Sequence, residues 1–356
     1  MMYSPNLIVY TVAILCFIFS FAGFYVLSQR NEEFAPRKNT PFLIFLPVII
    51  ISFFASYSLL PDKSDFIYSF SLRQLIVTIG GSGVIYFSFR FLDSKILKAF
   101  ICSVCSIIAC WFIPTEFILI PQLSPIVGKA ILCLCLFAFS YFYPLSNNID
   151  TLTCIQTLGI NIGIFVLALI GGTPVLFGSF ALSLAAICLA FLAFNRYPAQ
   201  LSFIPAGCNA LGFITGCQMI WSSIEGSSIA ILIFSMFFLV ELLSAIIRKM
   251  LDWQNSFALN TYTGCYQANL SGFPPYTIAG HILRLQIVLL LMGCFAIYAP
   301  IGVAVPVFSF IITVWYISKI KNWQIGNKTI RELNNDLMNN IKNNISNIKE
   351  QINKDK

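Results

Sequence analysis

Residues 153–194 read TCIQTLGINIGIFVLALIGGTPVLFGSFALSLAAICLAFLAF, a stretch without a charged side chain. It holds two apolar runs, 153–170 and 174–194, and each is close to the roughly 20 residues that an α-helix needs to cross a bilayer. Lipid offers no hydrogen-bond partner to the backbone, so long apolar runs of this kind form helices. The stretch therefore predicts two consecutive membrane-spanning helices.

The rest of the chain repeats this pattern. Of its 356 residues 58% are hydrophobic and 10% are charged, against about 25% charged residues in a typical soluble domain. Nine further apolar runs are long enough to be spans: 7–28, 42–60, 71–89, 96–113, 126–145, 207–222, 227–247, 278–297 and 300–317. The composition excludes a soluble globular protein, and the runs predict an all-α polytopic membrane protein with about 11 transmembrane helices.

The positions of Lys and Arg predict the orientation of the chain. Basic residues accumulate in cytoplasmic loops, and here they follow the odd-numbered spans: Arg30, Arg37, Lys38, Arg90, Lys95, Lys98, Arg196, Arg248 and Lys249. We therefore expect a multi-pass chain with the N-terminus outside and the C-terminus in the cytoplasm. The same rule explains the net charge of +7 without a nucleic-acid partner.

The composition changes near residue 318, which divides the chain into a transmembrane domain, 1–317, and a polar tail, 318–356. In the tail, Ile and Leu residues from Ile330 to Ile352 recur every three or four positions, as on one face of a helix. This pattern predicts either an amphipathic helix on the inner leaflet or a short coiled coil that joins two copies of the chain. Two connections are also distinctive, a proline-rich hairpin over 114–125 and a long cytoplasmic loop over 248–277.

The 12 cysteines lie almost entirely within apolar runs. We interpret them as small buried hydrophobic residues rather than as a disulfide framework or a zinc site. Polar residues within spans are few. Glu241 lies seven residues before Arg248, which predicts an ion pair or a snorkelling arrangement, while Lys129 and the single histidine, His281, lie at helix ends, where structural roles are expected.

Two cytoplasmic carboxylates are the strongest candidates for chemistry. Asp93 follows the third span, Asp150 lies between the fifth and sixth, and Arg90, Lys95, Lys98 and Arg196 lie in neighbouring loops. Carboxylates and basic side chains at one membrane face would suit a magnesium ion shared with phosphate oxygens. The alternative is that the aspartates cap helices and that the basic side chains contact lipid headgroups.

A motif near the seventh span suggests a family. Residues 194–213 read FNRYPAQLSFIPAGCNALGF, and this resembles the polyprenyl-phosphate sugar-1-phosphate transferases of the glycosyltransferase 4 superfamily, where F-N-x-x-P-A-K precedes G-D-x-G-S and L-G-F. Residues 147–153 are similar to that family's D-G-x-D-G-L segment, and 90–98 stand where its D-D motif occurs. The resemblance also covers Arg37, Lys38 and Pro41 and residues 241–257, and so extends over about 1–317.

The resemblance implies that a polyprenyl phosphate attacks a UDP-sugar at the cytoplasmic face of a bacterial inner membrane with Mg²⁺, for synthesis of a cell-envelope polysaccharide. Asp93 and Asp150 would then be the catalytic and metal-binding residues. Six residues would bind the substrates: Arg90, Lys95, Lys98, Asn147, Asn195 and Arg196. The polyprenyl chain would occupy a hydrophobic groove between helices.

Several positions depart from the family pattern. One aspartate of the D-D pair is missing, Asn147 replaces an aspartate, Ile204 and Pro205 replace Gly-Asp, and Gln200 replaces a lysine. The loop histidines expected near 263–266 are also missing. Two alternatives to a transferase therefore stay open: a non-catalytic relative that binds polyprenyl phosphate or a partner transferase, and a transporter or flippase, for which broken spans in matching halves are expected.

Overall fold

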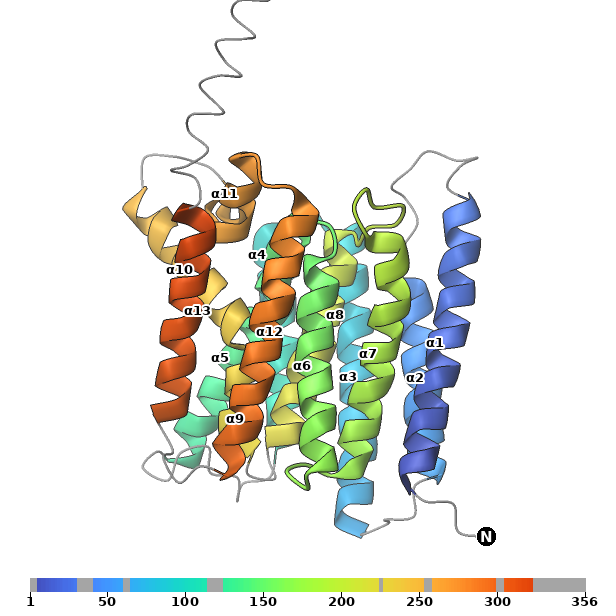
Figure 1. The fold of residues 1–356 in the computed structure, drawn as a ribbon. Coiled ribbons are helices and arrows are strands. Elements are labelled where there is room, and N and C mark those ends of the chain that lie inside the picture. The colour runs from blue at the N-terminus through green and yellow to red at the C-terminus, as the bar shows by residue number, and fades with distance from the viewer. Residues whose placement is uncertain are drawn as a thin grey trace, which may run out of the picture.

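The computed structural model describes residues 5–30, 41–59, 65–113, 124–223, 227–252, 258–298 and 304–322. Within these ranges the chain is helical and has no strand, which confirms the all-α prediction. The long helices run side by side, and their connections gather at the two ends of the bundle (Figure 1). We call these ends upper and lower as Figure 1 shows them, with the start of α1 at the lower end.

The helices follow the predicted runs closely. Their bounds are α1 Pro5–Arg30, α2 Phe42–Leu59, α3 Asp65–Phe91, α4 Lys95–Trp111, α5 Pro125–Phe142, η1 Tyr143–Asn148, α6 Leu152–Leu169, α7 Val175–Asn195, α8 Pro205–Ser222, α9 Ser228–Phe234, α10 Met236–Leu251, η3 Leu259–Tyr262, α11 Gly264–Leu270, α12 Pro275–Tyr298 and α13 Ala304–Asn322. The last helix continues past residue 317, where the tail was predicted to begin. The predicted hairpin over 114–125 lies almost wholly outside the described residues, as does the amphipathic pattern of the tail.

Six of the described helices are long and apolar enough to cross a membrane, and a bent pair, α9 with α10, brings the number to seven. The predicted number was about 11. Both α2 and α13 are apolar but shorter. Of the two remaining predicted spans, α4 has 17 residues, with Lys95 and Lys98 near its start, and α8 contains polar and glycine residues among its buried positions.

The predicted single span over 227–247 is bent. Helix α9 ends at Phe234, α10 begins at Met236, and the two axes meet at 60°. Ser235 lies at the break, where its hydroxyl donates to the carbonyl of Leu232 at 2.8 Å. A transporter was expected to have broken spans in matching halves, and among the described helices this is the one bent pair.

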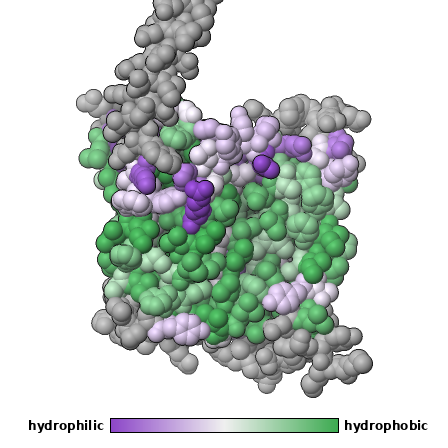
Figure 2. Space-filling model, in the orientation of Figure 1, coloured by the Kyte–Doolittle hydropathy of each residue, from purple (hydrophilic) through white to green (hydrophobic). Residues whose placement is uncertain are grey.

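Aromatic side chains pack together between α1, α2 and α7. Phe191 of α7 contacts Phe24 of α1 and Phe45 of α2 with ring centroids 5.1 and 5.7 Å apart, and Phe203 at 4.4 Å. Phe203 belongs to the connection between α7 and α8, so this cluster holds that connection against the core. The outer face is a broad hydrophobic band, and hydrophilic residues gather toward the upper end (Figure 2).

Close packing of α5 against α8 positions the upper end of α5. A Cβ atom at Gly212 of α8 would lie 2.2 Å from the carbonyl oxygen of Phe139 and 2.6 Å from Cβ of Tyr143. Only glycine allows this approach of backbone to backbone. The contact holds η1, which begins at Tyr143, next to the start of α8.

Candidate functional site

Three connections meet at the upper end of the bundle. They are residues 143–151 between α5 and α6, residues 195–204 between α7 and α8, and residues 258–264 between α10 and α11, and we refer to them together as the loop cluster. Hydrogen bonds between residues far apart in the sequence join all three. The loop cluster contains Asn147, Asp150, Asn195 and Arg196 of the predicted site.

Asn195 ties the first two connections together. Its side chain is 3% exposed; Oδ1 accepts the backbone N–H of Thr151 at 2.8 Å, and Nδ2 donates to the carbonyl of Leu201 at 2.8 Å. Thr151 has φ of 74°, a left-handed conformation that is strained for a β-branched residue. The amide of Asn195 therefore holds a strained turn in place and is not available to a substrate.

The other asparagines have similar structural roles. Nδ2 of Asn147 donates to the carbonyl of Phe203 at 2.8 Å. Asn148 and Asn260 bond each other: Asn260 Nδ2 donates to Asn148 Oδ1 at 3.2 Å, and Asn148 Nδ2 donates to the carbonyl of Asn260 at 3.5 Å. These bonds connect η1 to both other parts of the loop cluster.

Asp150 lies half-buried within the loop cluster. Its carboxylate accepts the backbone N–H of Ala199, and burial raises the pKa of this carboxyl above its ordinary value of 3.8. Neither aspartate occupies the N-cap of α4 or α6, because Ser94 caps α4 and Thr151 occupies the cap position of α6; the capping part of the alternative is therefore wrong for these two helices. Asp150 instead bonds the FNRYPAQ segment, in which the Tyr197–Pro198 peptide is cis.

The remaining predicted residues form a second group at the corner between α3 and α4. Arg90 ends α3, Asp93 lies in the three-residue connection, and Lys95 begins α4; all three side chains are exposed. Lys98 lies over the ring of Phe89 with Nζ 5.3 Å from the centroid, a cation–π contact. The structure thus leaves the cationic side chains of this corner facing outward.

A magnesium site at Asp93 and Asp150 stays a prediction, and the two aspartates lie on separate connections of the bundle. Asp150 is engaged with the backbone of Ala199, whereas Asp93 is exposed on a different connection. Within the described ranges no group of three His, Cys, Asp or Glu side chains is placed to hold a metal ion.

Glu241 and Arg248 were predicted to form an ion pair, and each has other partners. The carboxylate of Glu241, 7% exposed, accepts the backbone N–H groups of Gly264 and Cys265 at 2.9 Å each. The guanidinium of Arg248 donates to the carbonyl of Tyr262 at 2.9 Å and to Oε1 of Gln267 at 3.4 Å. Both side chains therefore fasten the predicted long loop, which folds into η3 and α11, onto α10.

Two other polar residues for which structural roles were expected, His281 and Lys129, also contact groups within the fold. Nδ1 of His281 lies 3.1 Å from the hydroxyl of Tyr316, which joins α12 to α13. Lys129 donates to the carbonyl of Ile113 at 2.6 Å. All 12 cysteines are free, and nine are buried, which confirms their interpretation as small interior residues.

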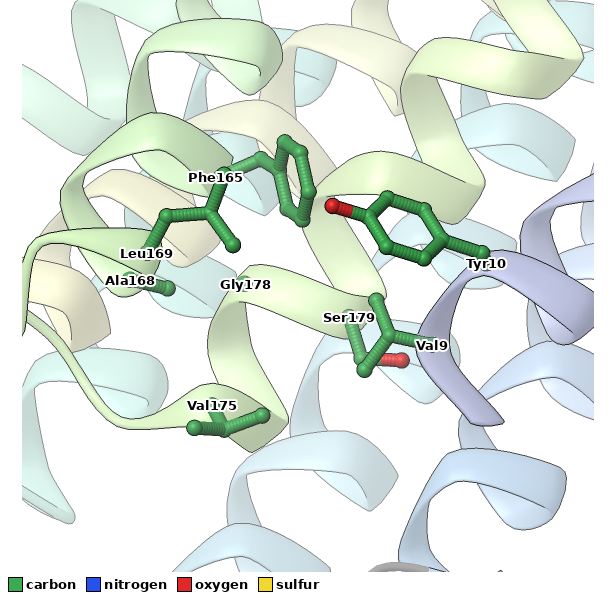
Figure 3. A pocket seen from close by; sticks show the side chains of 8 residues that line it. All are labelled: Val9, Tyr10, Phe165, Ala168, Leu169, Val175, Gly178 and Ser179. Carbon is green, nitrogen blue, oxygen red and sulfur yellow. The ribbon is translucent and has the colours of Figure 1, made fainter. Parts of the chain in front are cut away.

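The cavities inside the bundle are small. One lies beneath the loop cluster, lined by residues that include Ser146, Glu241 and Thr263, and has a volume of about 10 Å³. Another, between α1, α6 and α7, has a volume of about 20 Å³, and in it the ring of Tyr10 faces Phe165 (Figure 3). Each has room for about one water molecule, so neither is a preformed pocket for a nucleotide.

Sequence reasoning missed the importance of Asn148, Thr151 and Asn260. A signal for the first was present in the Ser-Asn-Asn run at 146–148, since asparagine bonds nearby backbone and favours turns. No local pattern marks Asn260, whose partner is 112 positions away.

Comparison with known proteins adds no assignment, because the sequence matches no family model and no curated protein.

Proposed function

We propose that this protein is a multi-pass membrane protein that binds a polyprenyl phosphate at its upper, cytoplasmic end without transferring a sugar phosphate to it. The proposal combines the resemblance to the sugar-1-phosphate transferases with the geometry of the loop cluster. It includes about eleven spans, an N-terminus outside and a location in a bacterial inner membrane.

One observation supports binding without turnover more than any other. Asn195 and Asn147 stand in motif positions where the resemblance implies contact with substrate, yet their amides bond Thr151, Leu201 and Phe203 within the fold. An active site needs groups that are held close to the reacting atoms and free to act on them. Here the polar side chains of the motif stabilise the loops themselves.

Binding of a phosphate is supported by the exposed cations. Arg90, Lys95 and Arg196 are exposed and lie at the ends of α3, α4 and α7, all of which reach the upper end (Figure 1). Guanidinium and ammonium groups bind phosphate oxygens through charge-assisted hydrogen bonds. Apolar side chains on α3 and α4, among them Phe87, Phe91 and Phe100, are exposed near these cations, as an isoprenoid chain requires.

The proposed orientation is supported by the basic residues at the upper end of the bundle. Lys and Arg accumulate at the cytoplasmic side of membrane proteins, and the described upper end also carries Arg248 and Lys249 in the last turn of α10. If α2, α4, α8 and α13 also cross the bilayer, the helices alternate in direction and give eleven spans when α9 and α10 count as one.

The test compares a polyprenyl phosphate with the corresponding polyprenol, which lacks the phosphate. We expect the purified chain to bind the phosphate at least tenfold more tightly, and the triple substitution Arg90→Gln, Lys95→Gln, Arg196→Gln to abolish this preference. Lys319→Gln is the matched control, because Lys319 is an exposed cation that stacks on Trp315 at 5.0 Å. Equal binding of phosphate and alcohol by the unchanged chain would refute the proposal.

A further inference from the structure

The outer surface of the bundle carries a groove between α4 and α5 with a volume of about 560 Å³. Its lining residues recur every three or four positions on each helix, so that one face of α4 opposes one face of α5. The lining is Ser103, Ile107, Cys110 and Trp111 from α4 and Lys129, Ala130, Cys133, Leu134 and Phe137 from α5. It is almost entirely apolar and is far larger than the interior cavities.

Among the described residues that line the groove, one is a cation, Lys129, and it lies at the lower end. Nζ of Lys129 donates one hydrogen bond, at 2.6 Å, to the carbonyl of Ile113 just beyond the end of α4. An ammonium group has three N–H donors, so two remain for another acceptor. Trp111, 79% exposed, lines the same end, and tryptophan with lysine at helix ends is typical of the interface between lipid and water.

The groove has the length of one lipid leaflet. From Trp111 to Ser103, and equally from Lys129 to Phe137, a rise of 1.5 Å per residue gives about 12 Å, close to half of the roughly 30 Å hydrocarbon thickness. The walls are exposed apolar side chains, Ile107 at 54% and Leu134 at 67%, whereas Cys110 at the base is 4% exposed. The groove therefore runs from the interface toward the middle of the bilayer.

We propose that this groove binds one phospholipid with an anionic headgroup, whose acyl chain lies along α4 and α5 and whose phosphate accepts hydrogen bonds from Lys129. The positive charge of Lys129 favours a negatively charged headgroup. The site lies at the end opposite the loop cluster and does not depend on the proposed function.

The test uses the purified full chain in mild detergent, titrated with phosphatidylglycerol or phosphatidylcholine and observed by native mass spectrometry. We expect one phosphatidylglycerol to bind first and most tightly. Leu134→Trp fills the groove and should weaken the first binding of either lipid at least tenfold, as should Ala130→Leu if the tryptophan variant does not fold. Lys129→Gln should weaken phosphatidylglycerol alone by about fivefold, equivalent to ~1 kcal/mol.

Two substitutions elsewhere are matched controls. Leu291→Trp places the same bulk at an equally lipid-facing leucine of α12, 63% exposed, and Lys319→Gln removes a cation from another helix end; neither should change the first binding. The proposal fails if Leu134→Trp and Leu291→Trp behave alike, or if Lys129→Gln weakens both lipids equally. It also fails if the groove proves to be occupied by a second copy, seen as a dimer that dissociates in Leu134→Trp.

Discussion

Replacing Asn195 with alanine should destabilise the protein strongly, because two buried backbone groups lose their partners together. The N–H of Thr151 and the carbonyl of Leu201 each bond the Asn195 amide at 2.8 Å, and both residues are buried. An unsatisfied buried polar group costs about 1–3 kcal/mol, so the substitution should lower the free energy of unfolding by roughly 2–6 kcal/mol. The left-handed turn at Thr151 loses its support as well.

Thermal unfolding in detergent measures this effect. At about 2 °C per kcal/mol for a large chain, Asn195→Ala should lower Tm by about 4 °C or more. Asn161→Ala is the matched control, since Asn161 is also fully buried but its described bond goes to the Thr157 carbonyl of its own helix. Equal changes in Tm for the two variants would refute the assignment of Asn195 as the tie between the two connections.

Four further substitutions, the last of them a control for the third, probe other parts of the structure by the same measurement of Tm. Burial raises the pKa of Asp150 above 3.8, so the stability that this carboxyl contributes is fully present below pH 3.8 and is lost as the pH rises through the raised pKa. Asp150→Asn should therefore flatten the dependence of Tm on pH and raise Tm at neutral pH. An unchanged pH profile in this variant would contradict the burial of Asp150. Glu241→Gln removes a charged acceptor from the Cys265 N–H and should cost about 1.5–3 kcal/mol, which a Tm equal to the unchanged chain would exclude. Gly212→Ala should lower the free energy of unfolding by about 1–3 kcal/mol through overpacking. Its control, Gly80→Ala, has no atom within 4 Å of the new Cβ and should raise the free energy of unfolding by about 0.5–1 kcal/mol. A change of the same sign in both variants would contradict the close approach of α5 and α8.

The helices could be predicted from sequence because hydropathy and length determine them directly. The exception, the bend between α9 and α10 at Ser235, escaped prediction because the apolar pattern continues through it. Hydropathy alone also predicted that the run forming α8 is a membrane span like the others, although α8 buries polar side chains. Its Asn209 and Gln218 are fully buried and donate to carbonyls of Ser140 and Phe177, partners that only the packed bundle supplies.

The candidate site could be predicted in part. Sequence reasoning placed Asn147, Asp150 and Asn195 among the functional residues, and the fold does bring them together in one loop cluster. It could not tell whether their polar groups face a ligand or the backbone, because residue type does not determine the partner. Glu241 shows the same limit: its spacing from Arg248 suggested an ion pair, but backbone N–H groups more than 20 positions away are its partners.

The most direct test of binding without turnover is the transfer of radiolabelled sugar phosphate from a panel of UDP-sugars to a polyprenyl phosphate by the purified protein with Mg²⁺. We predict that no donor labels the lipid, although the protein retains the polyprenyl phosphate. Labelled lipid that disappears in both Asp93→Asn and Asp150→Asn would contradict the proposal and identify a working transferase.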